Sequence, residues 1–173
     1  MKRILLTGLL ALTACTPYLP SPRYVGKDMY AANVPVSRLE GRWYEVAGFP
    51  AVFQQGCRNT TADFASRSDG LMAVRHQCRD KATGQLRQAD AVASSVGPGQ
   101  FAVTTPGQLF ASGFLVLDMS PDGKMVLIGT HTRLTGWVLK RDRRVTPEEL
   151  DFAREVFKRN GYDIASLQRT HQR

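Results

Sequence analysis

The sequence has few of the residues that build catalytic or metal centres. It contains three cysteines and three histidines, and the histidines stand singly at positions 76, 131 and 171. This spacing fits no zinc site, because zinc ligands typically come in pairs only a few residues apart. A G-x-S-x-G nucleophile elbow, an H-E-x-x-H helix, a P-loop and a Gly-rich dinucleotide turn are also missing. The sequence therefore predicts no catalytic residue, no metal site and no cofactor.

The sequence also lacks a hydrophobic run of the ~20 residues that a membrane-spanning helix needs. The nearest is residues 4–12, which follow the cationic Lys2 and Arg3 and lead into Leu-Thr-Ala-Cys at 12–15. This layout is typical of a secretory signal peptide, predicted here at residues 1–14. Residues 12–15 also resemble the bacterial lipobox, so Cys15 is the predicted acylated first residue and membrane anchor of the mature protein. The alternative is a plain secretory signal in which Cys15 has no such role.

Export restricts the partners of the mature chain. Thr16 stands where an Asp would, by resemblance to enterobacterial lipoproteins, signal inner-membrane retention, so we expect the periplasmic face of the outer membrane. Removing residues 1–14 takes away Lys2 and Arg3 and lowers the formal charge from +8 to +6. Nucleic acid is not an expected partner outside the cytoplasm. This positive charge would attract anionic lipid head groups or lipopolysaccharide. The alternative is a basic surface that is simply solvated by water.

The remaining cysteines and the prolines indicate how the mature chain is organised. With Cys15 used for the anchor, Cys57 and Cys78 form an even pair in an oxidising compartment, which predicts a disulfide. Residues 15–36 contain four prolines and predict an extended tether between Cys15 and a single domain over 37–173. The S-x-x-E pattern at 37–40 predicts a capped helical turn where this domain begins.

Short β-rich runs separated by turn residues fill most of the domain. The runs predict eight strands, at residues 43–49, 60–66, 71–78, 86–94, 101–105, 114–119, 125–132 and 137–141. Turns such as Asp69-Gly70 and Asp122-Gly123 make neighbouring strands most simply antiparallel. Eight antiparallel strands form either a sandwich or a closed barrel, and composition does not choose between the two.

The chain after the strands changes to a helical pattern. Thr-Pro-Glu-Glu at 146–149 is a capped helix start, and Asn160-Gly161 is a stop. These signals predict one helix over 147–160, with an apolar stripe packed on the outside of the sheet. Beyond it we expect a short strand at 163–167 and a loose end.

Two short motifs resemble those of the lipocalin family. Residues 41–47 contain the G-x-W-Y-E pattern that opens the first lipocalin strand, and residues 137–141 resemble the closing motif that ends in Arg before the C-terminal helix. Residues 56–64 and 76–78 are similar to stretches of the bacterial, plant and apolipoprotein D-like branch. The resemblance implies an all-β fold, an eight-stranded antiparallel up-and-down β-barrel that encloses a calyx, with one C-terminal α-helix packed outside. Residues 118–121 depart from the family pattern, because they lack its corner aromatic.

The two motifs also predict how the barrel closes. Trp43, with the Arg141 guanidinium stacked on its face, would stopper one end in a contact worth ~0.5–2 kcal/mol. Side chains alternate along a strand, so an Arg141 at the closed end sends Leu139 and Trp137 toward the calyx. The predicted ligand contacts are Trp137, Leu139, Phe114, Val116, Phe101, Val103 and Leu127. For all except Trp137, ordinary core packing is the alternative.

An apolar calyx beside a bilayer suits a fatty acid such as palmitate or a lysophospholipid, since burial of the chain contributes ~25 cal/mol per Å². An acidic head group would need a cation at the rim, and the available cations are Arg58, Arg75, Arg87 and Arg133. We expect a non-enzymatic, lipid-anchored envelope lipocalin that binds and stores or transports such a ligand for membrane maintenance. Two alternatives stay open: a lipoprotein that acts through its surface without a ligand, and a lipocalin-fold enzyme with a calyx thiol. The sequence does not indicate an oligomeric state.

Overall fold

The computed structural model describes residues 28–107 and 112–173. The predicted signal peptide at 1–14, the predicted anchor Cys15 and residues 16–27 of the predicted tether lie outside the described residues. Within the described part of the chain, no helix is long and apolar enough to span a membrane.

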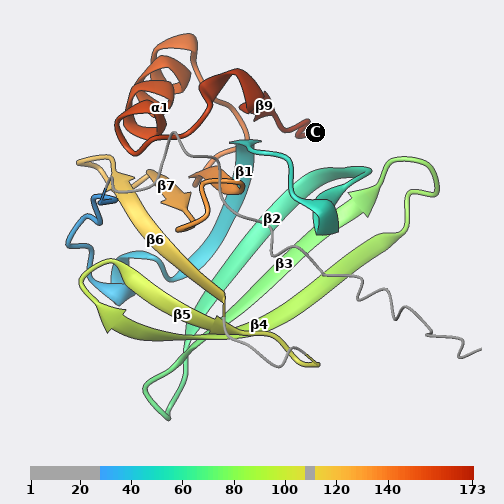
Figure 1. The fold of residues 1–173 in the computed structure, drawn as a ribbon. Helices are drawn as coiled ribbons and strands as arrows, with labels where there is room; N and C mark the ends of the chain where they lie inside the picture. Colours follow the sequence, from blue (N-terminus) through green and yellow to red (C-terminus); the bar gives the residue numbers. More distant parts are fainter. Residues whose placement is uncertain (1–27, 108–111) are drawn as a thin grey trace, which may run out of the picture.

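Eight antiparallel strands close on themselves to form a barrel (Figure 1). The strands are β1 (Gly41–Gly48), β2 (Cys57–Ser66), β3 (Met72–Asp80), β4 (Leu86–Gly97), β5 (Gln100–Thr104), β6 (Ser112–Met119), β7 (Met125–Gly129) and β8 (Gly136–Lys140). Each pairs with the next along the chain, and β1 pairs with both β8 and β2, which joins the two ends of the sheet. The eight predicted strands and the barrel with an external helix are confirmed. Closure leaves no exposed edge along the paired part of the sheet.

The C-terminal segment completes the sheet where β1 and β2 separate. β1 pairs with β2 only over residues 41–44, and Asn59 of β2 adopts a φ of 52° beyond that point. A short strand, β9 (Gln168–Arg169), pairs there with Ala47 and Gly48 instead. The Asn59 N–H also donates to the His171 carbonyl at 2.8 Å. The chain end is therefore packed between two strands, and the expectation of a loose end is wrong.

Residues 163–167, expected to form a strand, contain a 3₁₀ turn, Ile164–Ser166. The Asp163 side chain accepts a hydrogen bond from the Ala165 N–H and so caps this turn, which competes with extended backbone. The strand begins only after the turn has ended.

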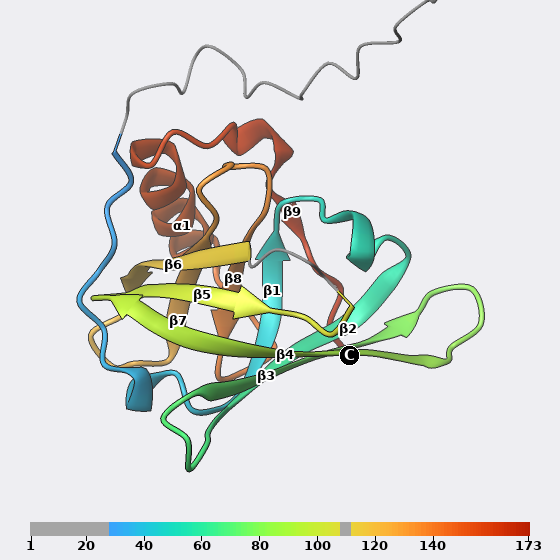
Figure 2. The same cartoon turned by 60° about the horizontal axis from the view of Figure 1, so that its bottom comes forward.

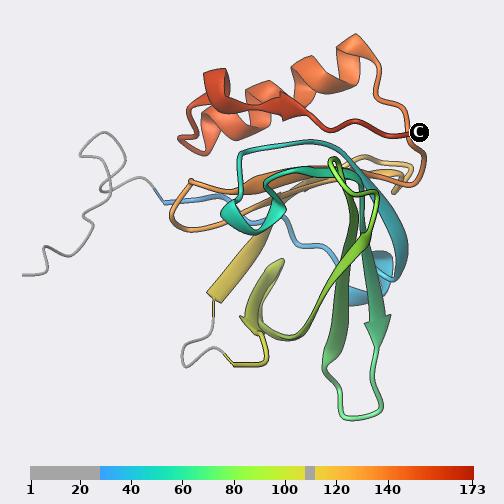
Figure 3. The same cartoon turned by 90° about the vertical axis from the view of Figure 1, so that its right-hand side faces the viewer.

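The α-helix of the described residues, α1 (Pro147–Arg159), lies outside the barrel against β6 and β7 (Figure 3). Its predicted capping box is present, since the Thr146 hydroxyl accepts from the Glu149 N–H and the Glu149 carboxylate accepts from the Thr146 N–H. The buried face consists of Leu150, Ala153, Val156 and Phe157. This face covers one side of the barrel and closes a second hydrophobic core there.

The chain that precedes β1 runs along the barrel rather than away from it (Figure 2). The Tyr30 N–H donates to Asn160 Oδ1 at 2.9 Å, and the Ala32 N–H donates to the Val116 carbonyl at 2.8 Å. The structure thus places residues 28–36 in the folded unit, in contrast to the expected tether. The helical turn expected at 37–40 is a 3₁₀ turn, Val36–Arg38, whose N-cap Pro35 makes no side-chain hydrogen bond, so the capping box is absent.

Two hydrophobic clusters occupy opposite faces of the sheet. The interior cluster lies inside the barrel and includes Trp43, Phe64, Phe101 and Phe114. The helix cluster lies between the sheet and α1 and includes Phe49, Leu117 and Phe157. A strand between the two clusters is buried on both faces, as β7 is along its whole length.

Candidate functional site

The closed end of the barrel is built around Trp43 and Arg141. The Arg141 guanidinium lies 3.7 Å from the centroid of the Trp43 ring, so the stacking predicted from the two motifs is present. Trp43 is fully buried, and its Nε1–H donates to the Leu39 carbonyl at 2.7 Å. The Arg141 guanidinium also donates to three backbone carbonyls, those of Arg38, Glu40 and Arg42. The indole N–H and both terminal nitrogens of the guanidinium therefore have partners inside the protein.

Gly41, the first residue of the opening motif, makes room for that guanidinium. Its φ is +91°, a conformation that side chains rarely adopt, and a Cβ at this position would lie 3.1 Å from Arg141 Nη1. The backbone conformation therefore favours glycine here, and the absence of a side chain leaves space for the arginine of the other motif.

An apolar cavity of about 410 Å³ occupies the open half of the barrel. It lies inside the strands and is bordered at the mouth by the loop between β1 and β2 and the loop between β7 and β8. The apolar side chains that dominate its wall include Phe64, Val74, Phe114, Ile128, Trp137 and Leu139. A volume of this size lies in the lower part of the range of ~300–1,000 Å³ that small-molecule sites occupy.

The predicted ligand contacts fall into three groups. Trp137, Leu139, Phe114 and Val103 line the cavity. Phe101 and Val116 also face the barrel interior, but they do not line the cavity. Phe101 stacks on Phe114 with ring centroids 4.7 Å apart, so it packs against a lining residue and helps to fix the position of that ring.

Leu127 does not face the calyx. It belongs to the helix cluster, while its neighbours Val126 and Ile128 point into the barrel. The prediction fails because α1 covers the outer face of β7, so both faces of this strand are buried and all its residues are apolar. The polar–apolar alternation that would show which side chains point inward is therefore absent. Placing Leu127 among the ligand contacts is therefore wrong, and Ile128 takes its place.

Several lining residues were not predicted. Phe64 and Val74 alternate with the charged Asp63 and Arg75, and this period-2 pattern is a signal that could have identified them. Phe53 lies in a loop, where no periodicity indicates which way a side chain points.

The mouth of the cavity is formed by three rings from distant parts of the chain. The rings of Phe53 and His76 lie 6.2–6.4 Å, centroid to centroid, from the Trp137 ring and 6.3 Å from each other. Gln54 fixes the position of this group, because its Oε1 accepts a hydrogen bond from Trp137 Nε1–H at 2.9 Å.

A buried carboxylate stands behind Gln54. Glu45 Oε2 accepts from Gln54 Nε2 at 2.5 Å, and Glu45 Oε1 accepts from the Thr170 hydroxyl at 2.5 Å. Burial raises the pKa of the Glu45 carboxyl above its usual range, and the two hydrogen bonds oppose this. A chain of hydrogen bonds thus links Trp137 at the cavity to the C-terminal segment.

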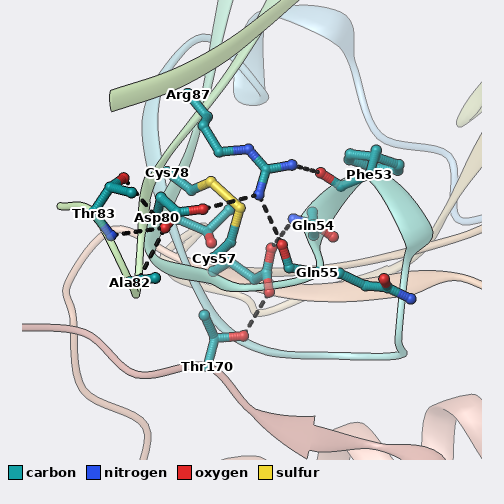
Figure 4. Close-up of a disulfide and its surroundings, with 12 residues drawn as sticks. Phe53, Gln54, Gln55, Cys57, Cys78, Asp80, Ala82, Thr83, Arg87 and Thr170 are labelled. Atoms are coloured by element: carbon teal, nitrogen blue, oxygen red, sulfur yellow. Dashed lines mark hydrogen bonds and ion pairs between the residues drawn. A yellow bond between two sulfur atoms is a disulfide. The ribbon is translucent and has the colours of Figure 1, made fainter. Parts of the chain in front are cut away.

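A disulfide and an arginine hold the loop at the mouth (Figure 4). Cys57 and Cys78 are joined, as predicted, so neither thiol is available as a nucleophile. Arg87 donates to the carbonyls of Phe53 at 2.8 Å and Gln55 at 2.7 Å, which ties the loop to β4.

The other arginines considered for the rim have different roles. Arg75 is paired with Asp90 in an exposed ion pair, and the Arg133 Nε–H donates to the Asn160 carbonyl at 2.7 Å. Arg58, like these two, is not part of the cavity wall.

His76 is the one lining residue with an unpaired, fully buried side-chain polar atom among the described residues, its Nδ1. Burial lowers the pKa of this imidazole below its usual range, and Asp63 partly opposes that effect. Within residues 28–107 and 112–173, no cluster of His, Cys, Asp and Glu side chains is arranged to hold a metal ion.

Comparison with known proteins agrees with this architecture. The family model "Lipocalin-like domain" matches residues 34–172. The chain is 28% identical to temperature-induced lipocalin-1 of Arabidopsis thaliana over 148 residues, which cover 79% of this chain and 78% of the relative. It is 26% identical to the outer membrane lipoprotein Blc of Escherichia coli K12 over 163 residues, 93% of this chain and 90% of the relative.

A solved structure shows the same fold at low sequence identity. Insecticyanin from the tobacco hornworm Manduca sexta superposes with a TM-score of 0.68 at 12% identity, over 85% of this chain and 86% of that one. The closed eight-stranded barrel, the Trp43–Arg141 stopper and the match over most of the sequence together show that the chain belongs to the lipocalin family.

Proposed function

We propose that this lipocalin binds a single-chain amphiphile, a fatty acid or a lysophospholipid, and stores or transports it unchanged for membrane maintenance. The observation that carries the proposal is the apolar cavity, whose aromatic and aliphatic wall would bury an acyl chain. Burial of that chain would contribute ~25 cal/mol for each Å² removed from water. The modest volume of about 410 Å³ favours one acyl chain over two.

We place the protein on the periplasmic face of the outer membrane, anchored through Cys15. The lipobox-like residues 12–15 and Thr16 support this location. The name of the Escherichia coli relative, an outer membrane lipoprotein, supports it independently.

The rim of the cavity supports exchange of the ligand with a membrane. On the side of the barrel where the cavity opens, the β1–β2 loop, the start of β4 and the β7–β8 loop carry exposed apolar side chains, namely Val52, Phe53, Leu86 and Leu134. Exposed apolar groups gathered around an opening are typical of sites that meet other apolar surfaces. The positive charge of the mature chain would add attraction to anionic lipid.

Intrinsic fluorescence tests the proposal, because the chain has only two tryptophans. A chain that begins at residue 16 keeps every described contact, and it is titrated after delipidation with palmitate and with a palmitoyl lysophospholipid. We expect saturable changes in Trp137 emission, since Trp43 lies at the closed end, and almost no signal from a Trp137→Phe variant. Mass spectrometry should recover the ligand intact.

Other outcomes would identify the alternatives. Chemical turnover of the ligand would show an enzyme, although the disulfide removes both candidate thiols. Absence of binding by any acyl ligand would indicate an envelope protein that acts through its surface.

A further inference from the structure

The imidazole of His76 is unlike every other polar group around the cavity. His76 lies on β3 in the same alternating row as Met72 and Val74, both of which belong to the interior cluster. Its Nδ1 is fully buried and has no hydrogen-bond partner among the described residues. A buried polar atom without a partner costs ~1–3 kcal/mol, and the protein does not hold this side of the ring through a hydrogen bond.

The neighbours of His76 cannot supply that partner. Phe53 and Trp137 flank the imidazole with their rings, and the Trp137 Nε1–H is already donated to Gln54. Arg87 is held by the Phe53 and Gln55 carbonyls. Nδ1 itself is closed off from the cavity, so only the rest of the ring borders that space, and His76 is the one basic side chain among the described residues that line it.

We propose that His76 binds an anionic head-group oxygen of the ligand, the carboxylate of a fatty acid or the phosphate of a lysophospholipid. This inference rests on the proposed function and names the contact that orients the ligand within it. The acyl chain then lies against the apolar wall formed by Phe64, Phe114 and Leu139. The imidazole supplies a donor to the oxygen, while the chain supplies most of the buried area.

The charged groups around His76 influence whether its imidazole is protonated when the ligand binds. Asp63 on β2 is paired with Arg42, and Asp90 on β4 is paired with Arg75 on β3 itself. Further charged groups on this side of the barrel are Arg87, which is held at the mouth, Glu45, which lies behind Gln54, and Arg58 on β2. None of them contacts the imidazole through a hydrogen bond in the described structure.

Ligand binding should therefore be linked to protonation of His76. In the ligand-free protein, burial lowers the pKa of the imidazole, so the ring is neutral at pH 7. An anionic oxygen within hydrogen-bond distance favours the charged ring and raises the pKa by about 1–3 units. A neutral head group offers no such charge and leaves the pKa low.

Nuclear magnetic resonance of ¹⁵N-histidine-labelled protein measures this directly, because only His76, His131 and His171 contribute. The pKa of His76 is measured without ligand, with palmitate, with palmitoyl lysophosphatidic acid and with hexadecanol. We expect an increase of at least one unit with one or both anionic ligands and none with hexadecanol. The anionic ligand that gives the increase identifies carboxylate or phosphate as the head group.

A variant pair provides the second readout. His76→Leu should weaken binding of that anionic ligand by about tenfold or more, the equivalent of one charged hydrogen bond, and leave hexadecanol binding within about twofold. His171→Leu, at an exposed position of the C-terminal segment that does not line the cavity, is the matched control and should change neither.

The outcomes separate this inference from the proposed function. If both ligand classes bind with an unshifted His76 pKa, His76 is not the head-group contact and the acyl-binding function stands. If no ligand binds to the folded wild-type chain, both fail. Should His76→Leu not fold, the titration of the wild-type protein decides alone.

Discussion

At the closed end of the barrel Trp43 is fully buried and its polar atom is bonded within the protein, whereas at the open end Trp137 borders a cavity. The stopper relies on backbone carbonyls of residues 38–42, in the turn that leads into β1 and at the start of β1. The mouth relies on side chains that reach across from loops, above all Gln54 and Arg87. This contrast suggests that the closed end mainly stabilises the barrel and that the open end binds the ligand. His76, whose Nδ1 has no hydrogen-bond partner, lies at the open end.

The largest effect should come from removing the stopper. Trp43→Ala should lower the free energy of unfolding by ~3–5 kcal/mol, because it leaves a cavity and an Arg141 without its ring. Trp137→Ala should cost clearly less, since that ring already borders open space. Urea denaturation of both variants compares the two ends, and equal losses would contradict the contrast.

The disulfide gives the next largest effect and belongs to the open end. Replacing Cys57 and Cys78 together by Ser should lower the free energy of unfolding by ~3 kcal/mol, since the bond restricts the unfolded chain. The measurement is chemical unfolding of wild type and double variant without reductant. Adding reductant should lower the unfolding midpoint of the wild type toward that of the variant. A midpoint that changes neither with the substitutions nor with reductant would refute the prediction.

The buried carboxylate at the mouth should make stability depend on pH. The folded-state pKa of Glu45 is raised by burial, so the stability from its protonated form is present at low pH and is lost as pH rises from the unfolded pKa through the folded pKa. Each unit of that increase corresponds to about 1.4 kcal/mol. Glu45→Gln should abolish this loss, and unfolding measured from pH 4 to pH 8 tests it. A variant with the wild-type pH profile would show that Glu45 is not the group responsible.

The smallest effect on stability should come from the loop side chain at the mouth. Phe53 is 52% exposed, so Phe53→Ser should change the free energy of unfolding by no more than ~0.5 kcal/mol. It should nevertheless weaken acyl-ligand binding, because the ring lines the cavity. Phe152→Ser, at an exposed position on α1, is the control for surface hydrophobicity and should leave binding unchanged. Equal binding by the two variants would remove Phe53 from the site.

Prediction from the sequence was accurate for the barrel strands and the helix, whereas the capping box expected at 37–40 is absent. Turn residues located the strands, and Thr146 with Glu149 marked the helix start. The Trp43–Arg141 contact came from the two family-like motifs. Prediction failed at Leu127, where apolar residues on both faces of β7 concealed the register, and at Phe53, which no periodicity places.

The sequence by itself determined the eight barrel strands, the helix with its cap and the pairing of Cys57 with Cys78, because each depends on neighbouring residues or on a simple count. Only the tertiary structure decided that β1 separates from β2 after Tyr44, that the C-terminal segment fills the space beyond that residue, and that residues 28–36 pack on the barrel. It also decided that Phe53 and Trp137 share one mouth with His76. These arrangements join residues far apart along the chain, and their free energy comes from pairing and burial that exist only once the barrel has closed.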